Sequence, residues 1–381
     1  MGERHDVIVV GGGLIGVALA CRLARLGGGR IALFERDSLA AGASARSCGM
    51  VGAATAMPAL TTRGLAMLAD AEETFGVADI GFVRSGHLTL ATDAVAAAAL
   101  EGEAAVLAAA GAEARLLTAA EAAALDPWLA VDDVAVALSL PAGGYLEVFT
   151  AARRIAEAAR EAGVTLVENR AVLGLYREGG RVGGIETALG PVAAEAVALT
   201  LGPWTAAFPE PLPLAVAARR HVVATIRPEA IYDPASPVVA ERGGAPGITY
   251  RPTHDGVVRV AAMAPGAPLA SPDEIEDVVG GDEIAALAER FARRFPGAAD
   301  AVFTQASVGA LAVTADGLPV IGALAEGLHV ACGFAGAGVG PGLAAAEALA
   351  RAILGGKAPP ATFAPGRFAA KPETSAETTR R

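Results

Sequence analysis

The apolar residues of the first forty positions follow two different periods, and together they predict a strand, a helix and a second strand. Residues 7–10 (VIVV) form an unbroken β-branched run, which is typical of a strand buried on both faces. Three glycines end this run. Residues 15–26 then place apolar side chains at helical spacing, with Arg22 and Arg25 on the polar side. Another glycine run precedes an apolar stretch at 30–34, so the pattern predicts a compact βαβ unit.

Apolar runs of the same kind recur in separated parts of the chain and predict one discontinuous domain. A strand is expected at residues 196–200, and a hairpin across 171–187 that turns at two adjacent glycines. A strand at 328–332 leads into a helix at 341–354. We therefore predict a Rossmann-like domain of the α/β class, built from residues 1–79, 149–212 and 306–381.

The intervening blocks show a different pattern, which predicts a second sheet. Strands are expected at residues 221–226, 247–251 and 257–262, and an amphipathic helix at 283–295. We predict that residues 80–148 and 213–305 form an inserted mixed-sheet α+β domain.

Some local signals concern helices and the end of the chain. Residues 61–75 are predicted to form one helix, and 118–125 a short helix that begins with a capping box of Thr118 and Glu121. The residues from Arg367 onward are predicted to be a frayed tail.

Composition and charge exclude several classes of function. With 53% hydrophobic and 19% charged residues, the 381-residue chain can bury a large core. A net charge of −11 argues against nucleic acid and anionic membranes as main partners. We find no apolar run of the ~18 residues that a membrane span needs and no signal-peptide pattern, so a cytoplasmic protein is expected. Three scattered cysteines and five scattered histidines match no disulfide or metal pattern, and no metal is predicted.

The most specific local motif follows the first strand. Gly11, Gly13 and Gly16 have the spacing GxGxxG: the first permits a tight turn, the second a close approach of a pyrophosphate, and the third helix–strand packing. Glu35 ends the second strand, where a carboxylate accepts hydrogen bonds from ribose hydroxyls. The motif predicts dinucleotide binding, against the alternative of a packing glycine cluster. It does not choose between FAD and NAD.

A second motif, residues 42–50 (GASARSCGM), lies just after Glu35. Its small residues and the cation Arg46 suit a loop that lies along a pyrophosphate and an isoalloxazine ring. The alternative is a flexible surface loop.

With these motifs in place, the chain resembles the FAD-dependent D-amino-acid oxidase superfamily, which includes glycine oxidase, sarcosine oxidases and amine dehydrogenases. The resemblance rests on five segments in order: "VIVVGGGLIGVALACRLA" with Glu35, "GASARSCGMV", "ALTLGPWT", "TADGLPVIG" and "ACGFAGAGVGPGLAAAEALARAILGG". It implies FAD as cofactor and a final helix whose N-terminus stabilises negative charge on the reduced ring. The residues it implies for cofactor binding are Gly11, Gly13, Leu14, Ile15, Gly16, Glu35, Arg36, Ala43, Ser44, Arg46, Ser47, Cys48, Gly49, Met50, Ala171, Val172, Gly202, Trp204, Gly333, Gly336, Gly338, Val339 and Gly340.

The resemblance also bears on how the flavin is attached. Some relatives bind it covalently through a cysteine or a histidine, and the matching positions here are near Gly309 and at Arg46. Neither is a usable nucleophile, and Cys48 lies two residues beyond the second position. Non-covalent FAD is therefore expected.

The chemistry implied by the resemblance is hydride transfer to flavin N5 from a C–H bond beside an amine, in an amino acid or secondary amine. The hairpin "GITYRPTHDGVVRVAAM" resembles the one that covers the substrate pocket, which makes Tyr250, Arg251 and Met263 candidate substrate residues together with His221. Successive strand side chains point to opposite faces, so Tyr250 and Arg251 cannot both face the flavin. We expect Tyr250 to point inward.

Two departures leave the substrate open. The arginine that grips a substrate carboxylate in glycine oxidase-like members falls at Leu311, and Ala337 stands where a histidine is common. Arg46, Arg220 and Arg251 are the candidates for a replacement. The electron acceptor is oxygen or another molecule. The alternative functions are a flavin-bearing subunit of a multi-subunit dehydrogenase and a 2-hydroxy-acid dehydrogenase of the same superfamily. The expected protein partners are other subunits or further copies of this chain in a homo-oligomer.

Overall fold

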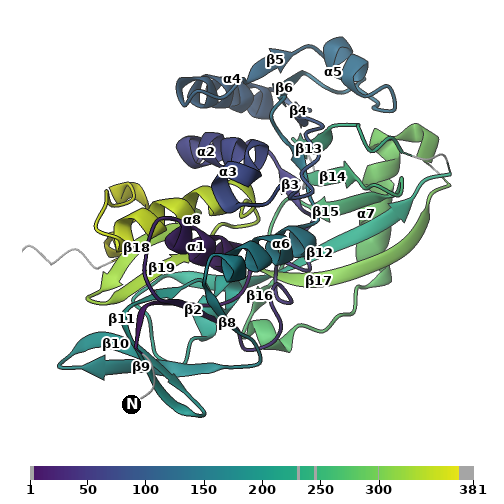
Figure 1. The fold of residues 1–381 in the computed structure, drawn as a ribbon. Coiled ribbons are helices and arrows are strands. Elements are labelled where there is room, and N and C mark those ends of the chain that lie inside the picture. Colours follow the sequence, from purple (N-terminus) through teal and green to yellow (C-terminus); the bar gives the residue numbers. More distant parts are fainter. Residues whose placement is uncertain (1–3, 230–231, 244–246, 299, 369–381) are drawn as a thin grey trace, which may run out of the picture.

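The computed structural model describes residues 4–229, 232–243, 247–298 and 300–368, and it contains two large sheets that lie side by side (Figure 1). The first sheet has the order β18-β19-β11-β1-β2-β8, with β10 and β9 added in sequence to β11. Its central pairs, β11 with β1 and β1 with β2, are parallel. Its strands are β1 (His5–Val10), β2 (Ile31–Phe34), β8 (Thr165–Val167), β9 (Val172–Glu178), β10 (Arg181–Thr187), β11 (Gly190–Leu199), β18 (Val320–Ala325) and β19 (Leu328–Cys332).

Both faces of the first sheet are buried, as its run of β-branched residues predicts. Along β1, Val7 and Val9 pack into a core shared with helices, whereas Ile8 and Val10 pack on the opposite face against the β9–β11 strands. This alternation follows from the two-residue period of a strand. The predicted α/β class and Rossmann-like domain are confirmed.

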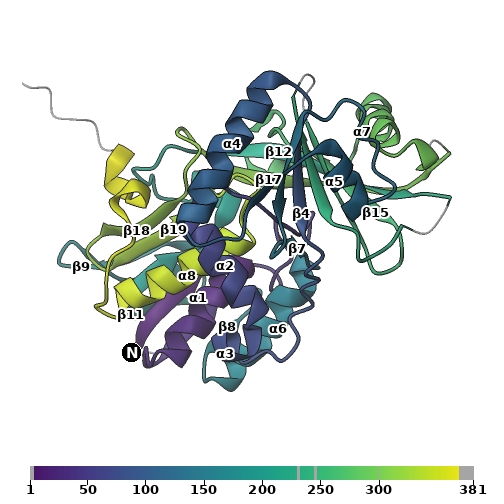
Figure 2. The ribbon, with the colours of Figure 1, turned by 90° about the horizontal axis from the view of Figure 1, so that it is seen from above.

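Helices cover one face of this sheet. They are α1 (Leu14–Arg25), α2 (Pro58–Ala69), α3 (Ala71–Phe75), α6 (Val148–Glu161) and α8 (Gly340–Ile353). The view from above shows α8 packed beside α1 and α2 (Figure 2), and all three contribute to one hydrophobic core.

The second sheet has the order β16-β12-β15-β14-β13-β4-β6-β5, with β17 on the other side of β12. It is mixed, because β13 and β4 are parallel while the other pairs are antiparallel. Its strands are β4 (His87–Ala91), β5 (Arg115–Leu117), β6 (Val136–Leu140), β12 (Val216–Arg227), β13 (Val238–Arg242), β14 (Ile248–Pro252), β15 (Val258–Ala262), β16 (Pro268–Leu269) and β17 (Val302–Thr314). The accompanying helices are α4 (Ala94–Ala109), α5 (Ala119–Leu125) and α7 (Gly281–Arg294). A short ribbon of β3 (Met50–Val51) and β7 (Gly144–Tyr145) lies between the sheets.

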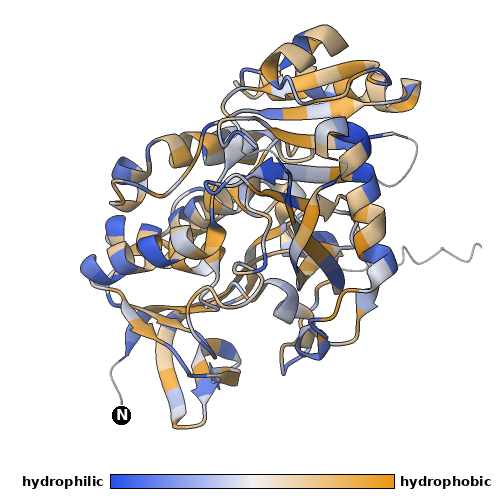
Figure 3. Cartoon of the chain, turned by 90° about the vertical axis from the view of Figure 1, so that its right-hand side faces the viewer, coloured by the Kyte–Doolittle hydropathy of each residue, from blue (hydrophilic) through white to orange (hydrophobic). Residues whose placement is uncertain are grey.

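The two faces of the second sheet differ in character. One packs on α7 through an apolar core that includes Val222, Val260 and Phe291. The other faces the first domain and carries polar side chains such as His87 and Thr89. Figure 3 shows much of the hydrophobic colour in the strands, with hydrophilic stretches mainly on helices and loops.

The structure corrects some boundaries. β17 pairs with β12 as far as Thr314, so residues 306–314 belong to the second sheet and not to the nucleotide domain. The helix expected over 61–75 breaks at Asp70, which caps α3 by accepting a hydrogen bond from the Glu73 backbone N–H. The Thr118–Glu121 capping box is confirmed.

The end of the chain is only partly described. Arg367 is not frayed, because its guanidinium pairs with Asp316 at 2.7 Å. The rest of the predicted tail, 369–381, lies outside the described residues. In the described part of the chain, we find no helix with the length and apolar character that crossing a bilayer requires.

Candidate active site

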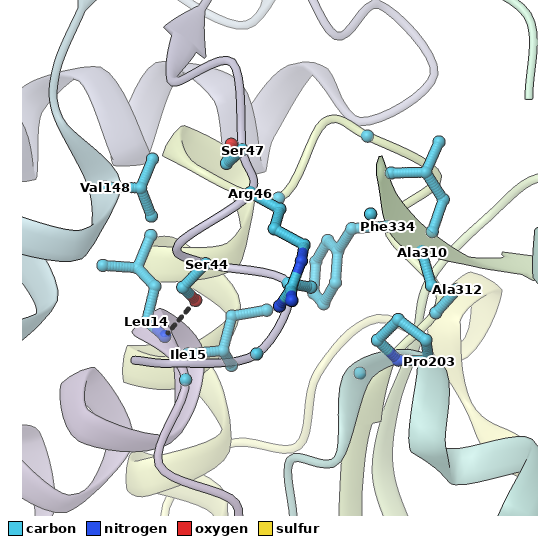
Figure 4. A pocket seen from close by; sticks show the side chains of 18 of the residues that line it. Leu14, Ile15, Ser44, Arg46, Ser47, Val148, Pro203, Ala310, Ala312 and Phe334 are labelled. Carbon is cyan, nitrogen blue, oxygen red and sulfur yellow. Dashed lines mark hydrogen bonds between the residues drawn. The ribbon is translucent and has the colours of Figure 1, made fainter. Parts of the chain in front are cut away.

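A large cavity lies between the polar face of the second sheet and the loops that end the strands of the first. Its volume is about 860 Å³, which is within the range of small-molecule sites. Figure 4 shows part of it, with side chains from the starts of α1 and α6, the 42–50 loop, β17, and the segments that follow β11 and β19. The cavity therefore joins elements that are more than 300 residues apart in sequence.

The glycine turn after β1 forms one end of this cavity. Gly11 has φ +103° and donates its N–H to the Phe34 carbonyl at 2.9 Å. A Cβ on Gly11 would lie 2.7 Å from the Thr200 carbonyl oxygen, and one on Gly16 would lie 1.8 Å from the Gly11 oxygen. Gly11 and Gly13 line the cavity with Leu14 and Ile15, whereas Gly16 faces the turn and packs the helix against it. The close packing agrees with the roles that the motif predicts for Gly11 and Gly16.

Glu35 and the 42–50 loop hold this turn in place. Glu35 accepts the backbone N–H of Gly12 at 2.7 Å and that of Asp37 at 2.9 Å. The Ser44 hydroxyl accepts the N–H of Leu14 at 3.0 Å, the dashed contact in Figure 4. Every residue that the resemblance names in this loop lines the cavity: Ala43, Ser44, Arg46, Ser47, Cys48, Gly49 and Met50.

Two further groups of expected cofactor residues reach the same cavity. Ala171, Val172, Gly202 and Trp204 line it near Glu35 and Arg36, and Gly333, Gly336, Gly338, Val339 and Gly340 line it where α8 begins. Arg36 stacks over the Trp204 ring, with its guanidinium carbon 4.9 Å from the ring centroid. Asp273 accepts hydrogen bonds from both side chains, at 2.6 Å from Arg36 and 2.7 Å from Trp204.

Two observations indicate that these residues fit FAD. The residues that precede α1 and α8, Gly13 and Val339, supply no capping side chain, and neither helix has an acidic residue in its first turn. The Ser44 hydroxyl takes the N–H of Leu14, and the dipoles of both helix starts favour an anionic ligand such as a pyrophosphate. Glycines also keep the turn and the approach to α8 free of side chains over the length of the cavity.

The cysteines at the cavity bear on covalent attachment. Cys48 and Cys332 line it, and burial raises the pKa of both thiols, that of Cys332 to about 12. Thiols of this kind stay protonated and are weak nucleophiles. Non-covalent FAD stays a prediction.

On the substrate side, the structure corrects the expected orientation of Tyr250. Tyr250 is 0% exposed and lies on the α7 face of β14, with its ring centroid 4.8 Å from that of Phe295 and 5.8 Å from that of Phe291. Thr249, one residue earlier, lines the cavity instead. Successive residues of a strand face opposite sides of the sheet. The predicted strand is present, but the residue that faces the cavity is Thr249 and not Tyr250.

Arg251 is also outside the cavity lining. Its side chain is fully buried, pairs with Glu147 at 2.6 Å and lies over the Tyr145 ring at 4.8 Å. Arg220 is held by Glu283 at 2.7 Å and does not line the cavity either. His221 and Met263 do line it.

Several polar cavity residues are not recognised from the sequence, among them His87, Thr89 and Arg242 on the second sheet. His87 is 6% exposed, and burial, aided by the nearby charge of Arg242, lowers its pKa to about 4. Burial likewise lowers the pKa of His221 to about 4. Sequence could have found the first two, because "HLTLA" alternates polar and apolar residues with the period of a strand. Nothing in the local sequence marks Arg242.

No group of three or more His, Cys, Asp and Glu residues suited to a metal ion occurs among the residues that the structure describes.

Comparison with known proteins identifies relatives over part of the chain. Glycine oxidase of Geobacillus kaustophilus is 35% identical over 217 residues, covering 54% of this chain and 56% of that enzyme. The 4-methylaminobutanoate oxidase (formaldehyde-forming) of Paenarthrobacter nicotinovorans is 33% identical over 201 residues, 52% of this chain and 24% of that enzyme. The matches thus span about half or less of these curated relatives.

Solved structures match over nearly the whole chain. The crystal structure of the Geobacillus kaustophilus glycine oxidase aligns with a TM-score of 0.80 at 27% identity, covering 95% of this chain and 98% of that one. L-proline dehydrogenase from P. horikoshii aligns with a TM-score of 0.85 at 21% identity, covering 97% and 98%, which supports the fold alone. The family model for FAD dependent oxidoreductase matches residues 6–352, a span that takes in the glycine turn, the polar face of the second sheet and the start of α8. The chain therefore belongs to the FAD-dependent oxidoreductase family.

Proposed function

We propose that this chain oxidises the C–N bond of an amino acid or a secondary amine. The observation that carries the proposal is the make-up of one cavity. Its first wall consists of glycine loops and two helix starts without acidic residues, which suit a dinucleotide, and its second wall is a sheet with a buried histidine, a half-buried histidine and an arginine. Such walls suit a small polar substrate held directly against the cofactor. The relatives named above include oxidases of amines and amino acids.

When bound, FAD supplies the acceptor for a hydride from the C–H bond beside the amine. The chain's own residues would hold it. The turn at Gly11 and Gly13 and the hydroxyl of Ser44 line the place for the pyrophosphate, and Glu35 the place for the adenosine ribose. The N-terminus of α8 brings a positive dipole end to the cavity, where it favours added negative charge.

The second wall suits an amine that must be neutral when it is oxidised. Because burial holds the pKa of His87 and of His221 near 4, both imidazoles are neutral at pH 7. A neutral imidazole adds no charge that would repel a protonated substrate on entry, and its unprotonated nitrogen can accept a hydrogen bond from the amine.

Part of the remaining lining is apolar. Met263, Ala262 and Leu311 are apolar and line the same cavity. A dry surface of this kind strengthens the polar contacts that orient the substrate.

The test is anaerobic flavin reduction by a substrate panel, followed as bleaching of the flavin absorbance. The panel contains sarcosine, glycine, proline, D-amino acids, opines and 2-hydroxy acids. We expect rapid reduction by at least one amine or amino acid. Rapid reduction by a 2-hydroxy acid and by no amine would overturn the proposal. Partner chains with an iron–sulfur centre or a second flavin in the purified protein would identify the subunit alternative.

A further inference from the structure

We propose that Arg242 binds the carboxylate of the substrate. This inference rests on the proposed function and names the anchoring residue that sequence could not locate. It makes the substrate a carboxylate-bearing amine, in other words an amino acid or an imino acid, and not a simple amine.

The positions of the arginines in the cavity wall limit which of them can bind the substrate carboxylate. Within the described part of the chain, the arginines that line the cavity are Arg36, Arg46, Arg170 and Arg242. Arg36 is held in a two-bond contact by Asp273. Arg170 directly follows β8, and its backbone N–H donates to the Glu35 carbonyl at 2.8 Å, so it stands at the nucleotide end.

Arg46 and Arg242 remain, and they stand on opposite walls. Arg46 belongs to the 42–50 loop, and its side chain runs across the cavity between Ser44 and Phe334 (Figure 4). Both neighbours belong to the wall that we assign to the cofactor. Arg242 ends β13 and is the one arginine of this set that stands on the second sheet.

Polar side chains share the cavity face of the sheet with Arg242, which itself lies opposite Ala91. In the parallel pairing of β13 with β4, Ala240 lies opposite Thr89, and β14 brings Thr249 opposite Ala240 on the other side. His87 precedes Thr89 by two residues, so it shares this face. Along β13, Arg242 lies four residues beyond Val238, the partner of His87, and its charge contributes to the lowered pKa of that histidine. A carboxylate here would meet a charge and neutral hydrogen-bonding groups.

Glu103 orients the guanidinium of Arg242 and leaves some of its N–H donors available. Its Oε1 atom lies 2.6 Å from Arg242 Nη1, and both side chains are mostly buried, at 29% and 20% exposure for Arg242 and Glu103. Arginine has five N–H donors in a planar fork, so a contact at Nη1 leaves donors for a second carboxylate. Glu103 comes from α4, outside the cavity lining, and it is a positioning residue for the arginine.

The test measures binding of two matched ligands to the FAD-loaded enzyme by the change in flavin absorbance. Pyrrole-2-carboxylate carries the carboxylate, and pyrrole-2-carboxamide is its neutral counterpart. Neither ligand has to be oxidised, so the result does not depend on turnover. The variants are Arg242→Gln, Arg242→Lys and the double variant Arg242→Gln with Glu103→Gln, which leaves no unpaired buried charge.

We expect the Kd of the carboxylate to rise roughly 100-fold in the double variant, with the Kd of the carboxamide changed less than about threefold. Arg242→Lys should lose roughly tenfold, because it keeps the charge and loses the fork. Arg220→Gln is the matched control. Like Arg242, Arg220 lies on the second sheet and pairs with a glutamate of a helix, but it lies outside the cavity lining. It should bind both ligands as the wild type does.

Three outcomes would overturn the inference. The variants could weaken both ligands equally, Arg46→Gln could abolish the preference for the carboxylate while Arg242→Gln preserves it, or the wild type could fail to distinguish the ligands. Failure of the proposed function is separate, because it requires that no amine or amino acid reduces the wild-type flavin.

Discussion

At the scale of single residues, the cavity is defined by which neighbour along a strand faces it. On β14, Thr249 lines the cavity and Tyr250 packs against the phenylalanines of the α7 side. On β4, His87 and Thr89 line the cavity, and Leu88 and Leu90 belong to the apolar core. A strand turns successive side chains to opposite faces, so a shift of one residue exchanges a binding residue for a core residue.

His87 gives a prediction for the pH dependence of stability. Its pKa is about 4 in the folded protein and about 6.5 when unfolded, so between these values the unfolded chain binds more protons. Stability should therefore fall as the pH is lowered from about 6.5 to about 4, by up to about 1.4 kcal/mol per pH unit for this group. His221 adds to the same slope, because burial lowers its pKa in the same way.

Replacing His87 with Asn should reduce the pH dependence of the free energy of unfolding between about pH 4 and 6.5 by the contribution of this one histidine. The measurement is the free energy of unfolding of the FAD-loaded protein in urea at a series of pH values. An unchanged slope in the variant would show that His87 titrates normally in the folded state.

At the scale of elements, α8 is positioned by close backbone contact with α2. A Cβ on Gly64 of α2 would lie 2.1 Å from the carbonyl oxygen of Gly340, the first residue of α8. An ion pair also joins these helices: Glu347 of α8 pairs with Arg63 of α2 at 2.6 Å. Glu347 pairs with Arg22 of α1 at 2.9 Å as well. Arg63 helps to hold the pKa of Glu347 at about 2, so this junction stays charged at neutral pH. The packing fixes where the N-terminus of α8 meets the cavity.

Replacing Gly64 with Ala should therefore destabilise the protein and weaken FAD binding. Backbone atoms would have to move, at about 1–3 kcal/mol, and the start of α8 would move with them. Urea unfolding and FAD titration of the apoprotein measure the two effects. Gly102→Ala on α4 is the control, because a Cβ at that position would meet no neighbouring atom within 4 Å, and it should stabilise the protein by about 0.5–1 kcal/mol. If Gly64→Ala bound FAD as tightly as the wild type, the contact between α2 and α8 would have no role in positioning the cofactor site.

At the scale of the whole molecule, the cavity exists only because the polar face of the second sheet is held against the loops that end the strands of the first. Asp273 follows β16 of the second sheet, yet it accepts hydrogen bonds from Arg36 after β2 and Trp204 after β11. The hydrogen bond from Arg36 is the main cause of its lowered pKa. This contact closes the cavity at the end where Glu35 lies.

Replacing Asp273 with Asn should speed the release of FAD. The contact is partly exposed, so the expected effect is modest, about two- to fivefold in the dissociation rate. The rate is measured as the return of free-flavin fluorescence after dilution of the loaded protein. Asp37→Asn is the control, since Asp37 contacts the same arginine at 3.0 Å without joining the two sheets. Equal rates in both variants would argue against a role in holding the sheets together.

Much of the cofactor side was predictable from sequence because its signals are local. The GxGxxG turn, the small-residue loop at 42–50 and the glycines before α8 each depend on backbone geometry that only certain residues allow. All cofactor residues inferred from these segments line the cavity except Gly16, whose close contact with Gly11 explains its place in the motif.

The substrate side could not be read in the same way, because its residues are ordinary strand residues brought together by sheet pairing. Arg242 becomes a cavity residue through the pairing of β13 with β4, two strands that lie far apart in sequence. All three arginines pair with a glutamate, but Arg220 and Arg251 lie outside the cavity lining. The sequence alone determined the class of fold, the dinucleotide turn and the family resemblance, since these depend on local periodicity and on glycines at strained positions. The tertiary structure decided which side chains face the substrate, because strand register and ion pairing are settled only when distant segments meet.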